Sequence, residues 1–360
     1  MNDNNKNTLN QAPPLGGWGV DKLLRPNILS LKPYSSARDE FSGSASVFLD
    51  ANENPYDTGY NRYPDPYQME VKKRIAEIKN TQTEQIFLGN GSDEPIDLLF
   101  RAFCNPGLDN VVAIEPSYGM YTVSAGINDV EIKKVRLSEN FELDSKKILE
   151  ASNNNTKLIF LCSPNNPSGN LLNKDEIINI VKHFGGIVIV DEAYIDFAPG
   201  ETLLPEINNY PNLVILQTFS KAWGLAGIRL GMAFTSPEII RILNKIKFPY
   251  NINSLTQQKV IEALNNHKQQ ESWVKTIINE RERLAKELKQ LNFVKKIYPS
   301  DANFLLVKMD RARDIFEFLM NKGVIVRDRS KVALCEGSLR ITVGSPEEND
   351  KLIQHLTTQQ

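Results

Sequence analysis

One lysine stands where it could do covalent chemistry. Lys221 follows the apolar run Leu213–Leu216, and several glycines and Arg229 come after it. A dry site favours the neutral amine of a lysine, and a neutral amine attacks a carbonyl carbon to form a Schiff base. Arg229 offers a planar, permanently charged fork for a phosphate, and the glycines let backbone approach a bound group. A single lysine is more often a solvated surface residue, so this prediction needs support from other segments.

Further polar residues follow apolar runs in the same way. Asp191 ends the run Ile187–Val190, where a carboxylate needs a positive partner such as a protonated pyridine nitrogen. Tyr194 follows closely and could reach a phenolic oxygen on the same ring. Asn166 lies in a proline-rich loop after Leu158–Cys162 and can donate a hydrogen bond to a ligand. A helix cap and an ordinary turn are the alternative interpretations.

Three more segments add groups that bind anions or flat rings. Gly91 precedes a predicted helix that Ser92 or Asp93 can cap, and such a helix start presents free N–H groups to a phosphate. Tyr118 follows another apolar run and can stack on a ring, although aromatic residues there are commonly core. Arg340 is a charge within an apolar strand, which indicates a buried carboxylate or phosphate ligand.

The elements that must position these residues alternate between Glu84 and Leu216. Short apolar runs typical of parallel strands are separated by helical patterns such as Lys174–Phe184. This alternation predicts an α/β open sheet with ligands at the carboxyl ends of its strands. Beyond Pro249 the pattern predicts a smaller α+β domain, which the segment Val47–Leu49 is expected to join. We therefore expect a leader (1–24), an amino-terminal segment contributing to the small domain and the active site (25–62), a large domain (63–252) and a small domain (253–360).

Composition excludes several classes of protein. Hydrophobic residues make up 41% and charged residues 24% of the 360 residues, and the net charge is −2, which disfavours nucleic-acid binding. No apolar run is long enough to cross a bilayer, and the first residues do not form a secretory signal. Cys104, Cys162 and Cys335 lack metal-ligand spacing and indicate reduced thiols in a cytoplasmic protein without a metal site.

In order and spacing, these segments resemble the fold-type I pyridoxal-phosphate aminotransferases, from about Arg25 onward. The resemblance implies a large domain with a mostly parallel seven-stranded sheet, a small α+β domain, and pyridoxal 5′-phosphate as cofactor. It implies that Lys221 forms the Schiff base, that Asp191 pairs with the pyridine nitrogen, and that Tyr118 stacks on the ring. The remaining implied cofactor ligands are Tyr194 and Asn166 at the ring hydroxyl oxygen, and Gly91, Ser92, Asp93, Ser220 and Arg229 at the phosphate.

Within this superfamily the chain is most similar to the histidinol-phosphate aminotransferase family. That resemblance implies reversible transamination between L-histidinol phosphate and 2-oxoglutarate, a step of histidine biosynthesis. The segments that carry the similarity are Leu31–Arg38, Asp50–Pro55, Arg327–Asp328 and Leu339–Gly344. Between Asp328 and Leu339 the chain departs from the usual pattern, which leaves the fine substrate preference open.

The resemblance also implies substrate and subunit contacts. Arg340 matches the arginine that binds the anionic group of the substrate, and Arg327 would add a second charge for a phosphate dianion. Asn166 is expected to contact substrate as well, and Tyr34 to close over the site from the amino-terminal segment. Tyr63 matches the tyrosine that reaches the cofactor phosphate of the partner subunit, which implies a homodimer with shared active sites.

Alternative functions stay open on the same scaffold. Aromatic or aspartate aminotransferases and threonine-phosphate decarboxylases share the motifs, because the sequence does not reveal which Cα bond is held perpendicular to the ring. A regulator with a degenerate aminotransferase domain would need a preceding DNA-binding domain, and the segment before Arg25 is short and not basic. A simple nucleotide-binding protein would have no need for Lys221.

Overall fold

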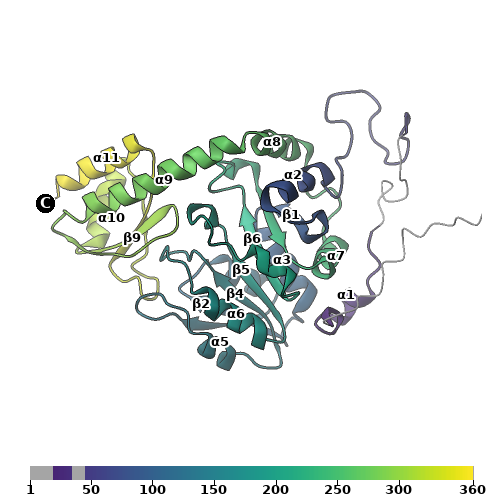
Figure 1. The fold of residues 1–360 in the computed structure, drawn as a ribbon, viewed down its shortest axis with the longest axis horizontal. Helices are drawn as coiled ribbons and strands as arrows, with labels where there is room; N and C mark the ends of the chain where they lie inside the picture. Colours follow the sequence, from purple (N-terminus) through teal and green to yellow (C-terminus); the bar gives the residue numbers. More distant parts are fainter. Residues whose placement is uncertain (1–18, 35–44, 360) are drawn as a thin grey trace, which may run out of the picture.

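The computed structural model describes residues 19–34 and 45–359 (Figure 1). Its larger sheet has seven strands in the order β1-β7-β6-β5-β4-β2-β3. Strands β2 to β6 run parallel, whereas β7 pairs antiparallel with both β1 and β6. The strands are β1 (Ile86–Asn90), β2 (Asn110–Glu115), β3 (Glu131–Arg136), β4 (Thr156–Cys162), β5 (Ile187–Asp191), β6 (Leu213–Thr218) and β7 (Leu230–Phe234).

Helices cover both faces of this sheet, so its central strands are buried on each side. In β5, Val188 and Val190 belong to one hydrophobic cluster, whereas Ile187 and Ile189 belong to the other. Burying one such side chain contributes about 1.5–3 kcal/mol, which explains why these strands are almost continuously apolar. The first cluster lies against α2 (Met69–Lys79), α5 (Ser145–Ala151), α6 (Lys174–His183) and α8 (Ser254–Asn265), and the second against α1 (Pro26–Ser30), α3 (Asp93–Phe103), α4 (Met120–Ile127) and α7 (Pro237–Ile246).

A second, four-stranded antiparallel sheet has the order β10-β11-β9-β8 and its own hydrophobic cluster. The long helix α9 (His267–Leu288) connects the two parts (Figure 1). Its residue Val274 packs in a cluster of the large sheet, whereas Leu284 and Leu288 pack in the cluster of the small sheet. The other elements here are β8 (Val294–Ile297), β9 (Phe304–Met309), α10 (Ala312–Asn321), β10 (Arg327–Asp328), β11 (Ser338–Thr342) and α11 (Pro346–Thr357). Short 3-10 helices span Val20–Lys22, Thr83–Gln85, Ile195–Phe197, Leu204–Asn208 and Ala226–Ile228.

The predicted fold class is confirmed, with one correction. The segment Val47–Leu49 does not join the small sheet, whose four strands all come from the carboxyl-terminal part of the chain. Val47 and Leu49 are exposed and so do not provide the buried apolar face that a strand of this sheet would need. None of the helices in the described part of the chain is long and apolar enough to span a membrane.

Candidate active site

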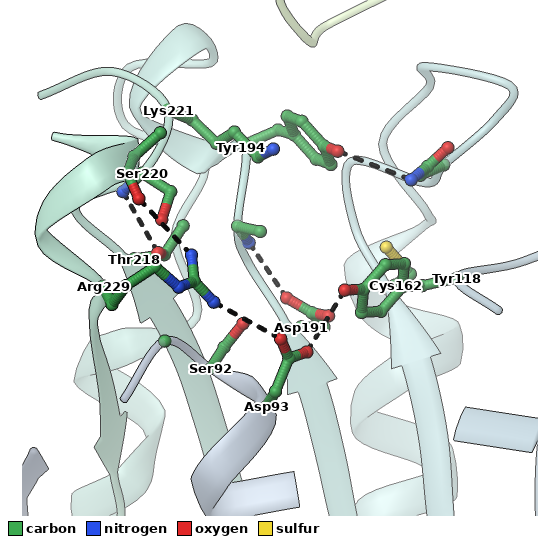
Figure 2. A pocket seen from close by; sticks show the side chains of 14 residues that line it. Ser92, Asp93, Tyr118, Cys162, Asp191, Tyr194, Thr218, Ser220, Lys221 and Arg229 are labelled. Atoms are coloured by element: carbon green, nitrogen blue, oxygen red, sulfur yellow. Dashed lines mark hydrogen bonds and ion pairs between the residues drawn. The ribbon is translucent and has the colours of Figure 1, made fainter. Parts of the chain in front are cut away.

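The predicted functional residues meet at the carboxyl ends of β4, β5 and β6, around a cavity of about 160 Å³ (Figure 2). Parallel strands bring their carboxyl ends to one edge of a sheet, which is where ligands bind in such folds. All the predicted cofactor ligands except Tyr63 line this cavity. Its lining consists of Gly91, Ser92, Asp93, Tyr118, Cys162, Asn166, Asp191, Ala193, Tyr194, Thr218, Ser220, Lys221, Ala226 and Arg229.

Asp191 forms the buried end of the cavity. Its Oδ2 accepts a hydrogen bond of 2.7 Å from the Tyr121 hydroxyl, and its Oδ1 accepts one of 3.1 Å from the backbone N–H of Ala193. Burial raises the pKa of Asp191 to about 6, against the lowering effect of these hydrogen bonds. An ionised Asp191 is therefore costly unless a cation meets it, and a protonated pyridine nitrogen is such a cation.

Lys221 lies across the cavity from Asp191. Its Nζ lies 5.6 Å from the centre of the Tyr194 ring. Burial, and then the charge of Arg340, lower the pKa of Lys221, whereas Asp191 acts in the opposite direction. Desolvation thus favours the neutral amine, the form that can attack a carbonyl or accept a proton.

Gly91 and Arg229 form one wall of the cavity, suited to an anion. Gly91 has a φ of +70°, and a Cβ there would lie 2.7 Å from Nη2 of Arg229, so any larger residue would push the guanidinium away. Nη2 of Arg229 is 3.6 Å from Oδ2 of Asp93, whose other oxygen accepts a hydrogen bond from Tyr118 (Figure 2). Ser92 stands at the N-cap of α3 without using its hydroxyl as a cap, which leaves that hydroxyl available to a ligand.

A chain of hydrogen bonds crosses from the small sheet to the large one. Nη1 of Arg340 donates to Oδ1 of Asn166 at 2.6 Å, and Nδ2 of Asn166 donates to the hydroxyl of Tyr194 at 3.4 Å. Asn166 is 7% exposed, and its two side-chain hydrogen bonds hold the amide in one orientation. Nε of Arg340 is buried without a partner in the described part of the chain. The guanidinium therefore contacts the cavity through Asn166 and keeps a further N–H that can donate a hydrogen bond.

The structure places four predicted residues outside the cavity lining, and one of them, Arg340, contacts the lining residue Asn166. Tyr63 stacks on Tyr250 with ring centres 4.4 Å apart and lines a separate cavity. Tyr34 lies at a third cavity, together with Tyr67 among other residues, and so does not close over Lys221 of its own chain. Arg327 lies opposite Arg340 on the neighbouring strand, at the exposed edge of the small sheet.

Other residues of the site were not predicted. Tyr121, the buried partner of Asp191, stacks on Phe160 and meets Tyr118 edge to face. Cys162 and Thr218 also line the cavity, each at the end of a strand. Position at a strand end is the sequence signal that could have found these two, whereas Tyr121 looks like an ordinary core residue of a helix.

This arrangement matches that of a known enzyme family. A profile described as "Aminotransferase class I and II" matches residues 44–356. The chain belongs to the class I and II aminotransferases. It is 59% identical over 331 residues to the histidinol-phosphate aminotransferase of Parabacteroides distasonis, covering 92% of this chain and 96% of that protein. It is 53% identical over 345 residues to that of Cytophaga hutchinsonii, covering 95% and 99%.

Solved structures show the same fold. The histidinol-phosphate aminotransferase of Clostridium acetobutylicum superposes with a TM-score of 0.77 at 26% identity, covering 83% of this chain and 91% of that one. That of Sinorhizobium meliloti, in complex with pyridoxal-5′-phosphate, gives a TM-score of 0.75 at 23% identity, covering 83% and 84%.

Aminotransferases of this family depend on pyridoxal 5′-phosphate, and the cavity fits that cofactor. Lys221 supplies an amine of lowered pKa, Asp191 a buried carboxylate, and Tyr118 a flat side chain beside them. The Gly91 turn leaves room that a Cβ would fill, next to the guanidinium of Arg229. The cavity thus offers Lys221 to an aldehyde, Asp191 to a pyridine nitrogen, and Gly91 with Arg229 to a phosphate.

Proposed function

We propose that this chain catalyses reversible transamination between L-histidinol phosphate and 2-oxoglutarate, giving imidazole acetol phosphate and L-glutamate in histidine biosynthesis. The close relatives named histidinol-phosphate aminotransferase support this proposal. The observation that carries it furthest is the pair Arg327 and Arg340, directly opposite on β10 and β11, with Arg340 hydrogen-bonded to Asn166 of the cavity. Two guanidiniums suit a phosphate monoester, which carries close to two charges.

The side chains divide the chemistry among themselves. Bound pyridoxal phosphate supplies the electron sink for deprotonation at the substrate Cα. Asp191 would keep the pyridine nitrogen protonated, because a buried carboxylate stabilises a proton on a basic partner. Lys221, whose pKa is lowered, would hold the cofactor through its amine and would accept the proton that leaves the substrate Cα. Tyr118, which lines the cavity, would stack on the cofactor ring and limit the access of water.

We propose further that two copies of the chain share their active sites. Tyr63 is 52% exposed and lines a cavity that does not include Lys221, so it does not serve the site of its own chain. An exposed, stacked tyrosine beside a cavity suits a contact with the partner subunit. Tyr34, 74% exposed, is proposed to act at substrate only in such an assembly. The division at residue 252 into a large and a small domain stays part of this proposal.

The half-reactions test the substrate assignment. Arg340→Ala should impair both the glutamate and the histidinol-phosphate half-reactions, by roughly a hundredfold or more, because the remaining anion would be buried without a partner. Arg327 is exposed, and solvent screening reduces its expected contribution to about 1 kcal/mol, or roughly fivefold. Arg327→Ala should show that loss only with histidinol phosphate. Each half-reaction is followed by the absorbance change of the cofactor in a single turnover.

Two results would overturn the assignment. Equal losses in both half-reactions for Arg327→Ala would remove Arg327 from the phosphate site. Release of carbon dioxide from threonine phosphate, without transamination of histidinol phosphate, would instead make the chain a decarboxylase.

A further inference from the structure

A third arginine lies on the same face of the small sheet as Arg327 and Arg340. The β10–β11 register pairs Arg327 with Arg340, and the backbone N–H of Arg329 continues the ladder with a hydrogen bond of 2.9 Å to the carbonyl of Ser338. Side chains two residues apart on a strand point to the same side, and so do directly opposed ones. Arg327, Arg329, Ser338 and Arg340 therefore share one face, and Asp328 between them takes the other.

Arg329 is half-buried on this face rather than extended into solvent. Its Nε is buried and has no hydrogen-bond partner within the described residues, and the same is true of Nε of Arg340 and Oγ of Ser338. The pKa of Arg329 is lowered, first by burial and then by the charges of Arg340 and Arg327, while Tyr194 of the cavity acts in the opposite direction. The geometric link to the active site is Arg340, which shares this face with Arg329 and donates a hydrogen bond to Asn166 of the cavity.

Among the residues that the structure describes, no acidic group balances these three cations. Across residues 19–34 and 45–359, no carboxylate forms an ion pair with Arg327, Arg329 or Arg340. The nearest acid in sequence, Asp328, is engaged instead by Arg313, at 3.5 Å. Like charges placed together on one face of a sheet repel one another, so an arrangement of this kind is favourable only when an anion joins it.

We propose that Arg329 is a specificity-determining residue that binds the phosphate of the substrate together with Arg327 and Arg340. This inference rests on the proposed function, because it assigns a third guanidinium to the phosphate end of histidinol phosphate. Three guanidiniums suit a dianion with three terminal oxygens better than they suit a single carboxylate. Arg329 thereby favours histidinol phosphate over glutamate and over the unphosphorylated alcohol.

The test compares Arg329→Gln with the wild-type holoenzyme. We expect KM for L-histidinol phosphate to rise about tenfold, the loss expected for one charge-assisted hydrogen bond, with kcat changed less than about twofold. Competitive inhibition by inorganic phosphate should weaken by a similar factor, whereas KM for L-glutamate and for L-histidinol should stay within about twofold. Arg329→Lys should recover part of the phosphate affinity, because it restores the charge without the planar fork.

A second readout separates binding from a structural role. Removing one of three repelling charges should leave the Tm of the phosphate-free holoenzyme equal or higher, and should reduce the rise in Tm that added inorganic phosphate produces. Lys351→Gln, at an exposed position of α11, removes the same charge from the helix that packs on the opposite face of the small sheet, and should behave as wild type. A fall in Tm with unchanged inhibition by phosphate would overturn the inference.

The two proposals fail in different ways. If the wild-type enzyme does not use histidinol phosphate but Arg329→Gln still weakens inorganic phosphate inhibition, the proposed substrate is wrong and the anion site stands. If histidinol phosphate is the substrate and Arg329→Gln matches Lys351→Gln in every assay, Arg329 has no part in phosphate binding.

Discussion

Removing the charge of Asp191 should change how the stability of the cofactor-free protein depends on pH. Asp191 is 2% exposed, and its pKa is about 6 in the folded chain, compared with an ordinary value of 3.8. The folded protein therefore holds the proton of Asp191 more tightly than the unfolded chain does. Its contribution to stability is fully present below pH 3.8 and is lost as the pH rises through about 6.

The size of this effect follows from the shift. The difference of about two between the folded and unfolded pKa values of Asp191 corresponds to about 3 kcal/mol in the free energy of unfolding. About 2 kcal/mol of this contribution is lost between pH 4.5 and 7.5. Asn has nearly the same shape as Asp and does not titrate. The free energy of unfolding of Asp191→Asn, relative to wild type, should therefore rise by about 2 kcal/mol across this range.

Urea unfolding of both cofactor-free proteins at several pH values measures the two free energies of unfolding. Subtracting one from the other removes the contributions of the titratable groups that both proteins share. The bound cofactor provides the control, because a protonated pyridine nitrogen compensates the carboxylate. With cofactor present, Asp191→Asn should bind it more weakly and slow the deprotonation of substrate by orders of magnitude. A stability difference that is the same at every pH would refute the account of Asp191 as a strained, buried carboxylate.

Three more substitutions test the site. Lys221→Ala should abolish turnover and the borohydride-stable link to the cofactor while keeping the far-UV circular dichroism spectrum; appreciable steady-state transamination would exclude both roles of Lys221. Tyr121→Phe removes a charge-assisted hydrogen bond of 2.7 Å and should raise the pKa of Asp191 by about one to two units. When the pH is lowered, the affinity of this variant for the cofactor should therefore begin to fall at a higher pH than that of wild type. An unchanged profile of affinity against pH would exclude this role of Tyr121. Mixing Tyr63→Ala with Lys221→Ala should restore part of the activity through hybrid sites, and sedimentation of a fully active monomer would contradict the shared-site dimer.

Much of the fold could be predicted because the central strands are buried on both faces. The apolar runs in β4, β5 and β6 fixed the sheet edge that Lys221 and Asp191 share. Strand β3 escaped prediction because it is an edge strand whose sequence alternates charged and apolar residues. Strand β7 was missed because its short run contains glycine and alanine and pairs antiparallel.

The site residues that were missed depend on contacts between distant segments. Tyr121 and Asp191 are 70 residues apart, and only the packing of α4 against the sheet brings them together. Arg329 follows a strand of two residues, and its face is defined by the pairing of β10 with β11 rather than by any local pattern. Conversely, Val47–Leu49 is a short apolar run of the kind that forms strands and yet joins neither sheet.

The central claim is that the enzyme transfers an amino group from L-histidinol phosphate. The most direct test mixes the cofactor-loaded enzyme with L-histidinol phosphate, L-aspartate, L-phenylalanine or L-threonine phosphate in separate single-turnover experiments and follows the absorbance of the cofactor. The account predicts the fastest conversion with L-histidinol phosphate, full recovery of the starting spectrum on addition of 2-oxoglutarate, and no release of carbon dioxide. Faster conversion with any of the other three donors would contradict it.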